Sequence, residues 1–186
     1  DLDRRGGAYD GMAWCGCGGL RSGTVAHTFS PGGVTRRAQV VQVLDNRAGE
    51  RDMTGVTTPF ADARSSWYRD AVAWAYQTGV VSGTSDTTFS PDQAVTREQI
   101  AVILMAFAAQ VPGAERPAAP ADLAAFPDGA QVSGWARDAM ADAVALGVLG
   151  GAAANGTLWL RPPGHATPPE VPTVPPGFGR SAAPLL

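Results

Sequence analysis

The strongest constraint on how this chain folds is an internal repeat. Shifting the sequence by 60 positions lays residues 10–44 over residues 70–104 without a gap. The matched positions share a tryptophan, a glycine and a Phe-Ser-Pro tripeptide, namely Trp14 with Trp74, Gly19 with Gly79, and Phe29-Ser30-Pro31 with Phe89-Ser90-Pro91. A fixed period of this length is typical of a fold built from repeated supersecondary units. We therefore expect a tandem array.

Each unit contains two helical patterns joined by a loop. In the second copy, apolar side chains recur at the spacing of one helix face over residues 72–79 and again over residues 100–107. Gly79 stands where a helix C-cap glycine belongs, and Thr96 and Gln99 have the spacing of a capping box. The stretch between the two patterns is rich in turn-forming residues. One unit is therefore predicted to be helix, loop, helix, and the fold class to be all-α.

A third copy, which starts at Phe126-Pro127-Asp128, is less regular. Trp135 aligns with Trp67, Leu160 replaces Phe89 as the apolar anchor of the loop, and that loop is three residues longer. The second helix should begin at Thr167, but prolines occupy positions 168, 169, 172, 175 and 176. Because an interior proline costs about 3 kcal/mol and removes a backbone donor, this segment is not expected to be helical throughout.

The copies divide the chain into repeats and linkers. We predict a first repeat over residues 1–48, a second over 58–109, a Pro/Ala-rich linker over 110–123 and a degenerate third repeat over 124–180. The stretch from residue 45 to residue 59 is also predicted to be a linker. The first residues lack the apolar run of a signal peptide, so we expect the chain to be a fragment of a longer protein.

Composition and residue spacing argue against several function classes. The chain has 14 basic and 17 acidic residues, a net charge of −3, whereas nucleic-acid binders usually carry a basic domain or stripe. No stretch approaches the apolar length that a membrane span needs. No Ser/His/Asp, Cys/His or paired-carboxylate set falls on adjacent elements, and the two Cys and two His have no zinc spacing. We therefore expect no enzyme, no metal site and no cofactor.

The motifs of the second copy together resemble the S-layer homology domain family. They are a Phe-x-Asp start, a Trp, a Gly-Val-Val-x-Gly turn, a Phe-x-Pro and a Thr-Arg pair, at Phe60-Ala61-Asp62, Trp67, Gly79-Val80-Val81-Ser82-Gly83, Phe89-Ser90-Pro91 and Thr96-Arg97-Glu98. The resemblance covers nearly the whole chain, with the first and third copies degenerate. It implies a pseudo-threefold body with a central bundle of second helices and projecting loop prongs. That body would be a monomer, or a dimer if the third repeat fails to fold.

The resemblance also implies a function and a set of contacting residues. Members of the family are non-catalytic anchors that hold exported bacterial proteins on the cell wall, and they bind secondary cell-wall polysaccharide, often pyruvylated, in grooves between prongs. The implied contacts are the Thr-Arg arginine with nearby aromatic and loop residues, namely Arg97, Arg37, Arg36, Trp67, Trp135, Gly83, Thr84, Gly23 and Thr24. A guanidinium at a helix N-terminus, beside free backbone N–H groups, suits the ketal carboxylate.

Three alternatives stay open at this point. Arg37 aligns with Arg97 without a gap, yet Thr35-Arg36 also spells the motif one residue earlier. Trp67 and Trp135 fit packing between helix and prong as well as stacking on sugar rings. The same helical repeats also fit a protein–protein or self-assembly module of a surface layer that binds no glycan.

Overall fold

The computed structural model describes residues 34–49, 51–64, 67–111, 117–150, 152–154 and 157–165. In this part of the chain the α-helices are α2 (Arg37–Ala48), α3 (Arg69–Gln77), α4 (Arg97–Gln110) and α5 (Arg137–Ala145). The 3₁₀ helices η1 to η4 are Ala61–Ala63, Leu123–Ala125, Gly129–Gln131 and Gly134–Ala136, and the strands are β1 (Ala152–Ala154) and β2 (Thr157–Trp159). The all-α fold class is confirmed, with one small hairpin added among these residues.

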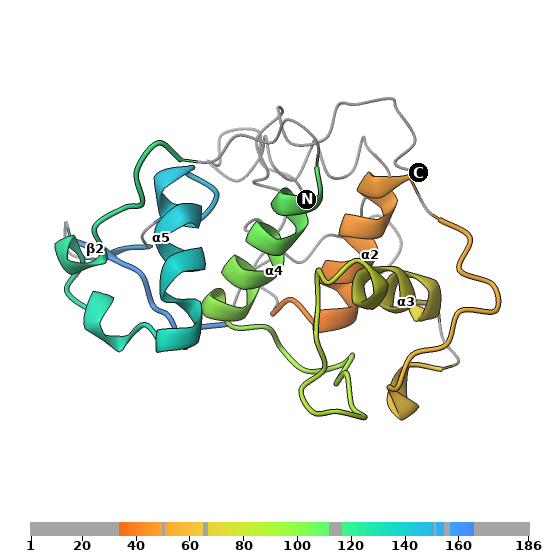
Figure 1. Cartoon of the computed structure of the whole chain (residues 1–186). Helices are drawn as coiled ribbons and strands as arrows, with labels where there is room; N and C mark the ends of the chain where they lie inside the picture. Colours follow the sequence, from red (N-terminus) through yellow and green to blue (C-terminus); the bar gives the residue numbers. More distant parts are fainter. Residues whose placement is uncertain are drawn as a thin grey trace, which may run out of the picture.

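The main helix packing joins neighbouring copies. In Figure 1, α2 of the first copy lies against α3 of the second, and α4 of the second copy lies against α5 of the third. Both α2 and α4 bury side chains on several faces, at Val40, Val41, Val43 and Leu44 in α2 and at Ile100, Ala101, Ile103, Leu104 and Phe107 in α4. A helix that is buried on several faces lies inside the fold. The second helices of the first two copies, α2 and α4, are therefore central, and each packs against the copy that follows it.

Matched positions in the second and third copies share the same backbone conformation. Gly79 after α3 and Gly147 after α5 have φ values of 73° and 68°, a left-handed conformation that glycine adopts without strain. Ser90 and Arg161 also have positive φ values, 59° and 50°, directly after the apolar anchor of each loop. The predicted helix end at Gly79 is confirmed, and the repeat extends from side chains to backbone geometry.

The loop of the third copy contains structure that the sequence did not predict. Ala152 pairs with Trp159 and Ala154 pairs with Thr157 in an antiparallel hairpin. At the matched place in the second copy, an isolated bridge joins Ser85 to Thr88. The sequence predicted only a longer loop. The added residues make room for a pair of short strands, and a hairpin this small has little sequence signal of its own.

The first connection between copies starts later than predicted. α2 continues through Ala48, so residues 45–48 are helical and the prediction of a linker from residue 45 is wrong. Asp45 is buried within this last turn, and Arg47 places a positive charge near the helix C-terminus, where the helix dipole favours it. The helix ends at Gly49, whose φ of 102° no longer fits a helix.

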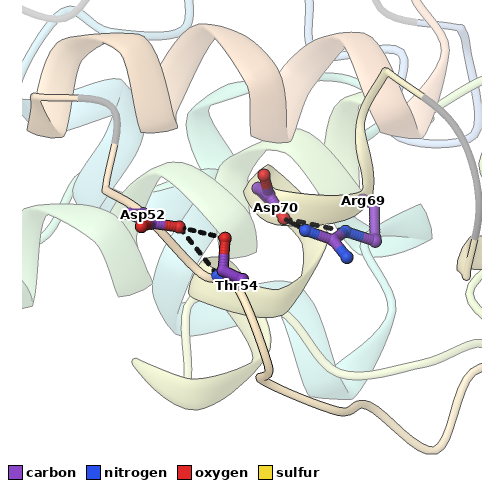
Figure 2. A network of polar contacts seen from close by, with 4 residues as sticks. All are labelled: Asp52, Thr54, Arg69 and Asp70. Carbon is purple, nitrogen blue, oxygen red and sulfur yellow. Dashed lines mark hydrogen bonds and ion pairs between the residues drawn. The ribbon is translucent and has the colours of Figure 1, made fainter.

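Local polar contacts hold the chain between α2 and α3 (Figure 2). Asp52 accepts a hydrogen bond from the backbone N–H of Thr54 at 2.9 Å and another from the Thr54 hydroxyl. At the start of α3, the Nε of Arg69 donates to Asp70 at 2.8 Å. Asp70 lies in the first turn of the helix, where an acidic side chain is stabilised by the helix dipole.

Several predictions fall outside the described residues. They concern Gly23 and Thr24 in the first loop and the proline-containing segment that begins at Thr167. Because the pseudo-threefold arrangement needs the second helix of the third copy, that arrangement also stays a prediction.

Candidate functional site

A groove of about 800 Å³ opens beside α4, and all three copies line it. The first copy contributes Arg37 from the start of α2. The second contributes the loop of residues 79–84 and one face of α4, and the third contributes Trp135 from η4. The structure thus brings together four of the predicted site residues, Arg37, Gly83, Thr84 and Trp135.

The walls of the groove combine aromatic rings with polar side chains. Tyr76 and Trp135 both line it, with 40% and 62% of their surfaces exposed. The Tyr76 ring stands edge-on to Phe60, with 5.0 Å between ring centroids. Gln93 and Gln99 add amide groups. Tyr76 belongs to the apolar helix face that the sequence predicts over residues 72–79, yet its side chain is exposed in the groove. The sequence did not predict that Gln93 or Gln99 lines a binding site.

The guanidinium of Arg37 joins the first copy to the loop of the second. Its Nε donates to the carbonyl of Phe89 at 2.9 Å and its Nη2 donates to the carbonyl of Ser82 at 3.0 Å. The guanidinium carbon also lies 4.8 Å from the centroid of the Phe89 ring. Burial lowers the pKa of Arg37, and the charge of Asp62 opposes that shift. Only 6% of Arg37 is exposed, and its Nη1 has no hydrogen-bond partner among the described residues.

Arg97 occupies the matched place one copy later. Its Nε donates to the carbonyl of Leu160 at 2.6 Å, and its Nη2 donates to the carbonyl of Gly150. Only 6% of Arg97 is exposed, and burial, followed by the charge of Arg161, lowers its pKa while Asp128 opposes the shift. Arg97 does not line the groove that contains Arg37. The structure places it between α4 and the loop of the third copy.

The N-termini of α2 and α4 are covered by the loop of the following copy. The first two backbone N–H groups of each helix donate to loop carbonyls: Arg37 to Gln93 and Ala38 to Pro91 in α2, Arg97 to Gly164 and Glu98 to Pro162 in α4. Donor–acceptor distances run from 2.9 to 3.3 Å. The expectation that these helix ends offer free N–H groups to a carboxylate is therefore wrong. The loop packs directly over the helix start and satisfies the donors that a free end would leave.

The structure also decides between the two readings of the first Thr-Arg motif. The side chain of Arg36 is exposed and pairs with Asp92 at 2.8 Å, while its backbone N–H donates to Gln39 at 3.0 Å. Arg37 makes the buried contacts that Arg97 makes one copy later. The alignment without a gap is correct, and Arg36 lies outside the lining of the groove.

In the second and third copies, the aspartate of the Phe-x-Asp motif binds the loop turn that has a positive φ value. Asp62 accepts from the backbone N–H groups of Phe89 at 2.9 Å and Ser90 at 2.8 Å. Asp128 accepts in the same way from the backbone N–H groups of Leu160 at 2.9 Å and Arg161 at 2.6 Å. Each carboxylate holds both N–H groups on either side of the loop anchor. The sequence motif was visible, but its role was not.

The remaining predicted residues divide by exposure. Trp67 is 65% exposed and stands edge-on to Tyr68, outside the groove lining. Phe89 and Leu160 are fully buried, which confirms them as loop anchors. A Cβ on Gly83 would lie 2.6 Å from the Phe60 ring and would also collide with the neighbouring loop carbonyls, so only glycine fits there.

Comparison with known families identifies the segment that contributes most of the residues lining the groove. A family model described as "S-layer homology domain" matches residues 59–101, which contain α3, the loop of residues 79–84 and the start of α4. Residues 59–101 are an S-layer homology domain. The S-layer homology domain is a non-catalytic module for anchoring at the cell surface.

Curated relatives match the chain beyond this one S-layer homology domain. The "Surface-layer 125 kDa protein" of Lysinibacillus sphaericus is 34% identical over 146 residues, which is 77% of this chain and 12% of that protein. An endoglucanase of Bacillus sp. (strain KSM-635) is 32% identical over 70% of this chain and 13% of its own length. An amylopullulanase of Thermoanaerobacterium thermosulfurigenes is 27% identical over 76% and 7%. The chain spans about a tenth of the length of these relatives.

The described residues lack two features that other functions would need. None of their helices is long and apolar enough to cross a membrane. Among the same residues, no group of three or more His, Cys, Asp or Glu side chains could hold a metal ion.

Proposed function

We propose that this chain is the cell-wall anchoring part of a larger exported bacterial protein and that it binds secondary cell-wall polysaccharide through the groove. The observation that carries the proposal is the convergence of Arg37, Gly83, Thr84 and Trp135 in one groove within and around an S-layer homology domain. The relatives, a surface-layer protein and two glycan-degrading enzymes by name, support a module that serves different cargoes.

The groove has the chemistry of a carbohydrate site. The rings of Tyr76 and Trp135 offer flat apolar surfaces for the faces of pyranose rings, and Thr84 and Gln93 offer polar groups for hydroxyls. Arg37 is the charged residue of the lining, and its Nη1, which makes no hydrogen bond to the described residues, suits a single carboxylate such as a pyruvate ketal. In this proposal Arg37 contacts the glycan.

Arg97 has a different role in the proposal. Because its guanidinium donates to Leu160 and Gly150, it holds the loop of the third copy against α4. Arg97 therefore supports the fold around the groove at a distance and makes no glycan contact there.

The test is cosedimentation of the purified chain with Gram-positive cell-wall sacculi, before and after hydrofluoric acid removes the secondary polysaccharide. Trp135→Ala is expected to weaken binding about tenfold, because loss of a well-placed aromatic anchor costs about 1.4 kcal/mol or more. Trp67→Ala is the matched control, since this ring is equally exposed but lies outside the groove. The charged contact should also weaken as salt rises.

Two results would contradict the proposal. Binding that survives hydrofluoric acid would show that the polysaccharide is not the ligand. Equal binding by the Trp135→Ala variant and the wild-type chain would show that the groove is not the site. Concentration-dependent self-association without sacculus binding would instead favour an assembly module.

A further inference from the structure

We propose that Glu98 is a positioning residue that fixes Trp135 at the edge of the groove. The inference rests on the proposed glycan-binding function, because it states what holds one wall of that site in place. Glu98 belongs to the second copy and Trp135 to the third, so the contact sets the geometry of the groove across a repeat boundary.

The contact is a carboxylate that binds both donors of one residue. Glu98 Oε1 accepts from the backbone N–H of Ser133 at 2.6 Å, and Oε2 accepts from the Ser133 hydroxyl at 3.0 Å. Ser133 is the residue before η4, and Trp135 lies in the middle of that single turn. Two bonds to one residue fix both the position and the direction in which the turn starts.

The surroundings of Glu98 favour a firm contact with Ser133. Glu98 is only 6% exposed, and no cation pairs with it among the described residues. Its charge is stabilised by the two Ser133 donors and by its place in the first turn of α4, where the helix dipole favours an acid. In the part of the chain that the structure describes, Ser133 is the residue that binds this carboxylate, and its release would leave a buried charge without hydrogen bonds.

The packing of η4 alone does not fix the direction of the Trp135 ring. Val132 and Ala136 on either side are buried, at 4% and 0% exposed, whereas the Trp135 ring is 62% exposed. The ring therefore has little packing of its own to fix its direction. Trp67 matches Trp135 one copy earlier and provides the contrast. The residue that matches Glu98 one copy earlier is Ala38, whose side chain cannot accept hydrogen bonds.

The experiment labels the five tryptophans with 5-fluorotryptophan and follows the Trp135 resonance by fluorine NMR, with Trp135→Phe and Trp67→Phe as assignments. In Glu98→Ala the Trp135 resonance is expected to shift and broaden while the Trp67 resonance stays unchanged. Sacculus binding should weaken about fivefold, which is less than the effect of Trp135→Ala, because the ring loses its fixed position but stays in the chain. Glu98→Gln should restore most of both readouts, because its amide can accept from the Ser133 N–H and donate to the Ser133 hydroxyl.

The outcomes separate this inference from the proposed function. A folded Glu98→Ala chain with an unchanged Trp135 resonance overturns the positioning role, whatever its binding. A Trp135 resonance that responds in a protein that binds no sacculi supports the positioning role and overturns glycan binding. If Glu98→Ala does not fold, Ser133→Ala is decisive, since it removes the hydroxyl bond alone. An unchanged Trp135 resonance in that variant then overturns the inference.

Discussion

Two junctions between copies share the same arginine contacts but differ in the apolar anchor of the loop. At the first junction, α2 meets the loop of the second copy, and Arg37 lies over the ring of Phe89. At the second junction, α4 meets the loop of the third copy, and Arg97 donates to the carbonyl of Leu160, which has no ring. Both arginines reach the loop through backbone carbonyls. The difference shows that the arginine and the backbone geometry define the junction, while the apolar anchor can vary.

The junctions also differ in how their helices begin. Thr96 before α4 accepts from the backbone N–H of Gln99, whose side chain accepts from the Thr96 N–H in return. Arg36 stands at the matched place before α2. There the Gln39 side chain accepts from the Arg36 N–H, but the Arg36 side chain has no oxygen that could accept from the helix. The second junction thus has a complete capping box and the first has half of one.

The largest effect is expected from removing a buried arginine. Arg97→Ala and Arg37→Ala should each lower the free energy of unfolding by about 3 kcal/mol, because two loop carbonyls lose a charged donor in a buried site. Urea unfolding measures the loss. Arg137→Ala is the matched control, since Arg137 also begins a helix but is exposed. A loss at Arg97 no larger than at Arg137 would contradict the structural role.

The next largest effect should distinguish the two aspartates that bind loop N–H groups, Asp62 and Asp128. Asp128→Ala should cost about 2 kcal/mol and Asp62→Ala about 1 kcal/mol, because both accept the same pair of loop N–H groups but Asp128 is 3% exposed whereas Asp62 is exposed. Thermal unfolding of the two variants in one buffer makes the comparison. Equal losses would mean that burial of the carboxylate adds nothing to this contact.

The pattern of success and failure from the sequence follows from the range of the interactions. Helix faces, the glycine after α3 and the capping box were predictable because they depend on residues within one turn. The contacts of Arg37 and Arg97 were not predictable, since their acceptors are carbonyls 45 and 52 residues away for Arg37 and 53 and 63 residues away for Arg97. A backbone carbonyl has no side-chain signature. The same distinction explains why only some of the residues that line the groove were predicted. Motif residues identified Trp135, while Tyr76 required the packing of the loop to be known.

A smaller effect tests the incomplete cap. Arg36→Thr should raise the free energy of unfolding by about 0.5 kcal/mol, because an N-cap hydroxyl is worth about 1 kcal/mol and the exposed pair with Asp92 is worth less. Arg36→Ala removes the same pair without supplying a hydroxyl, so the difference between the two variants isolates the cap. If Thr and Ala give equal stability, the start of α2 does not use a side-chain cap.

The smallest effect compares the two connections between copies. Asp52 accepts from the backbone N–H of Thr54, and Asp122 accepts from that of Ala124, both at 2.9 Å. Only the first connection adds a side-chain hydroxyl, and the hydrogen bonds from the Thr54 hydroxyl and then from its backbone N–H lower the pKa of Asp52 below its ordinary value of 3.8. A lowered carboxyl pKa stabilises the fold above the ordinary value, and this contribution disappears as the pH falls through the lowered one.

Thr54→Ala makes the first connection resemble the second and tests that argument. At neutral pH the variant should be slightly less stable than the wild-type chain, and the two should converge as the solution becomes acidic. The effect is small because Asp52 is fully exposed to solvent, which screens its charge. Chemical unfolding of both proteins across the acidic range measures the convergence. A stability difference that stays constant with pH would mean that Thr54 acts through its backbone preference, and that Asp52 does not couple this connection to protonation.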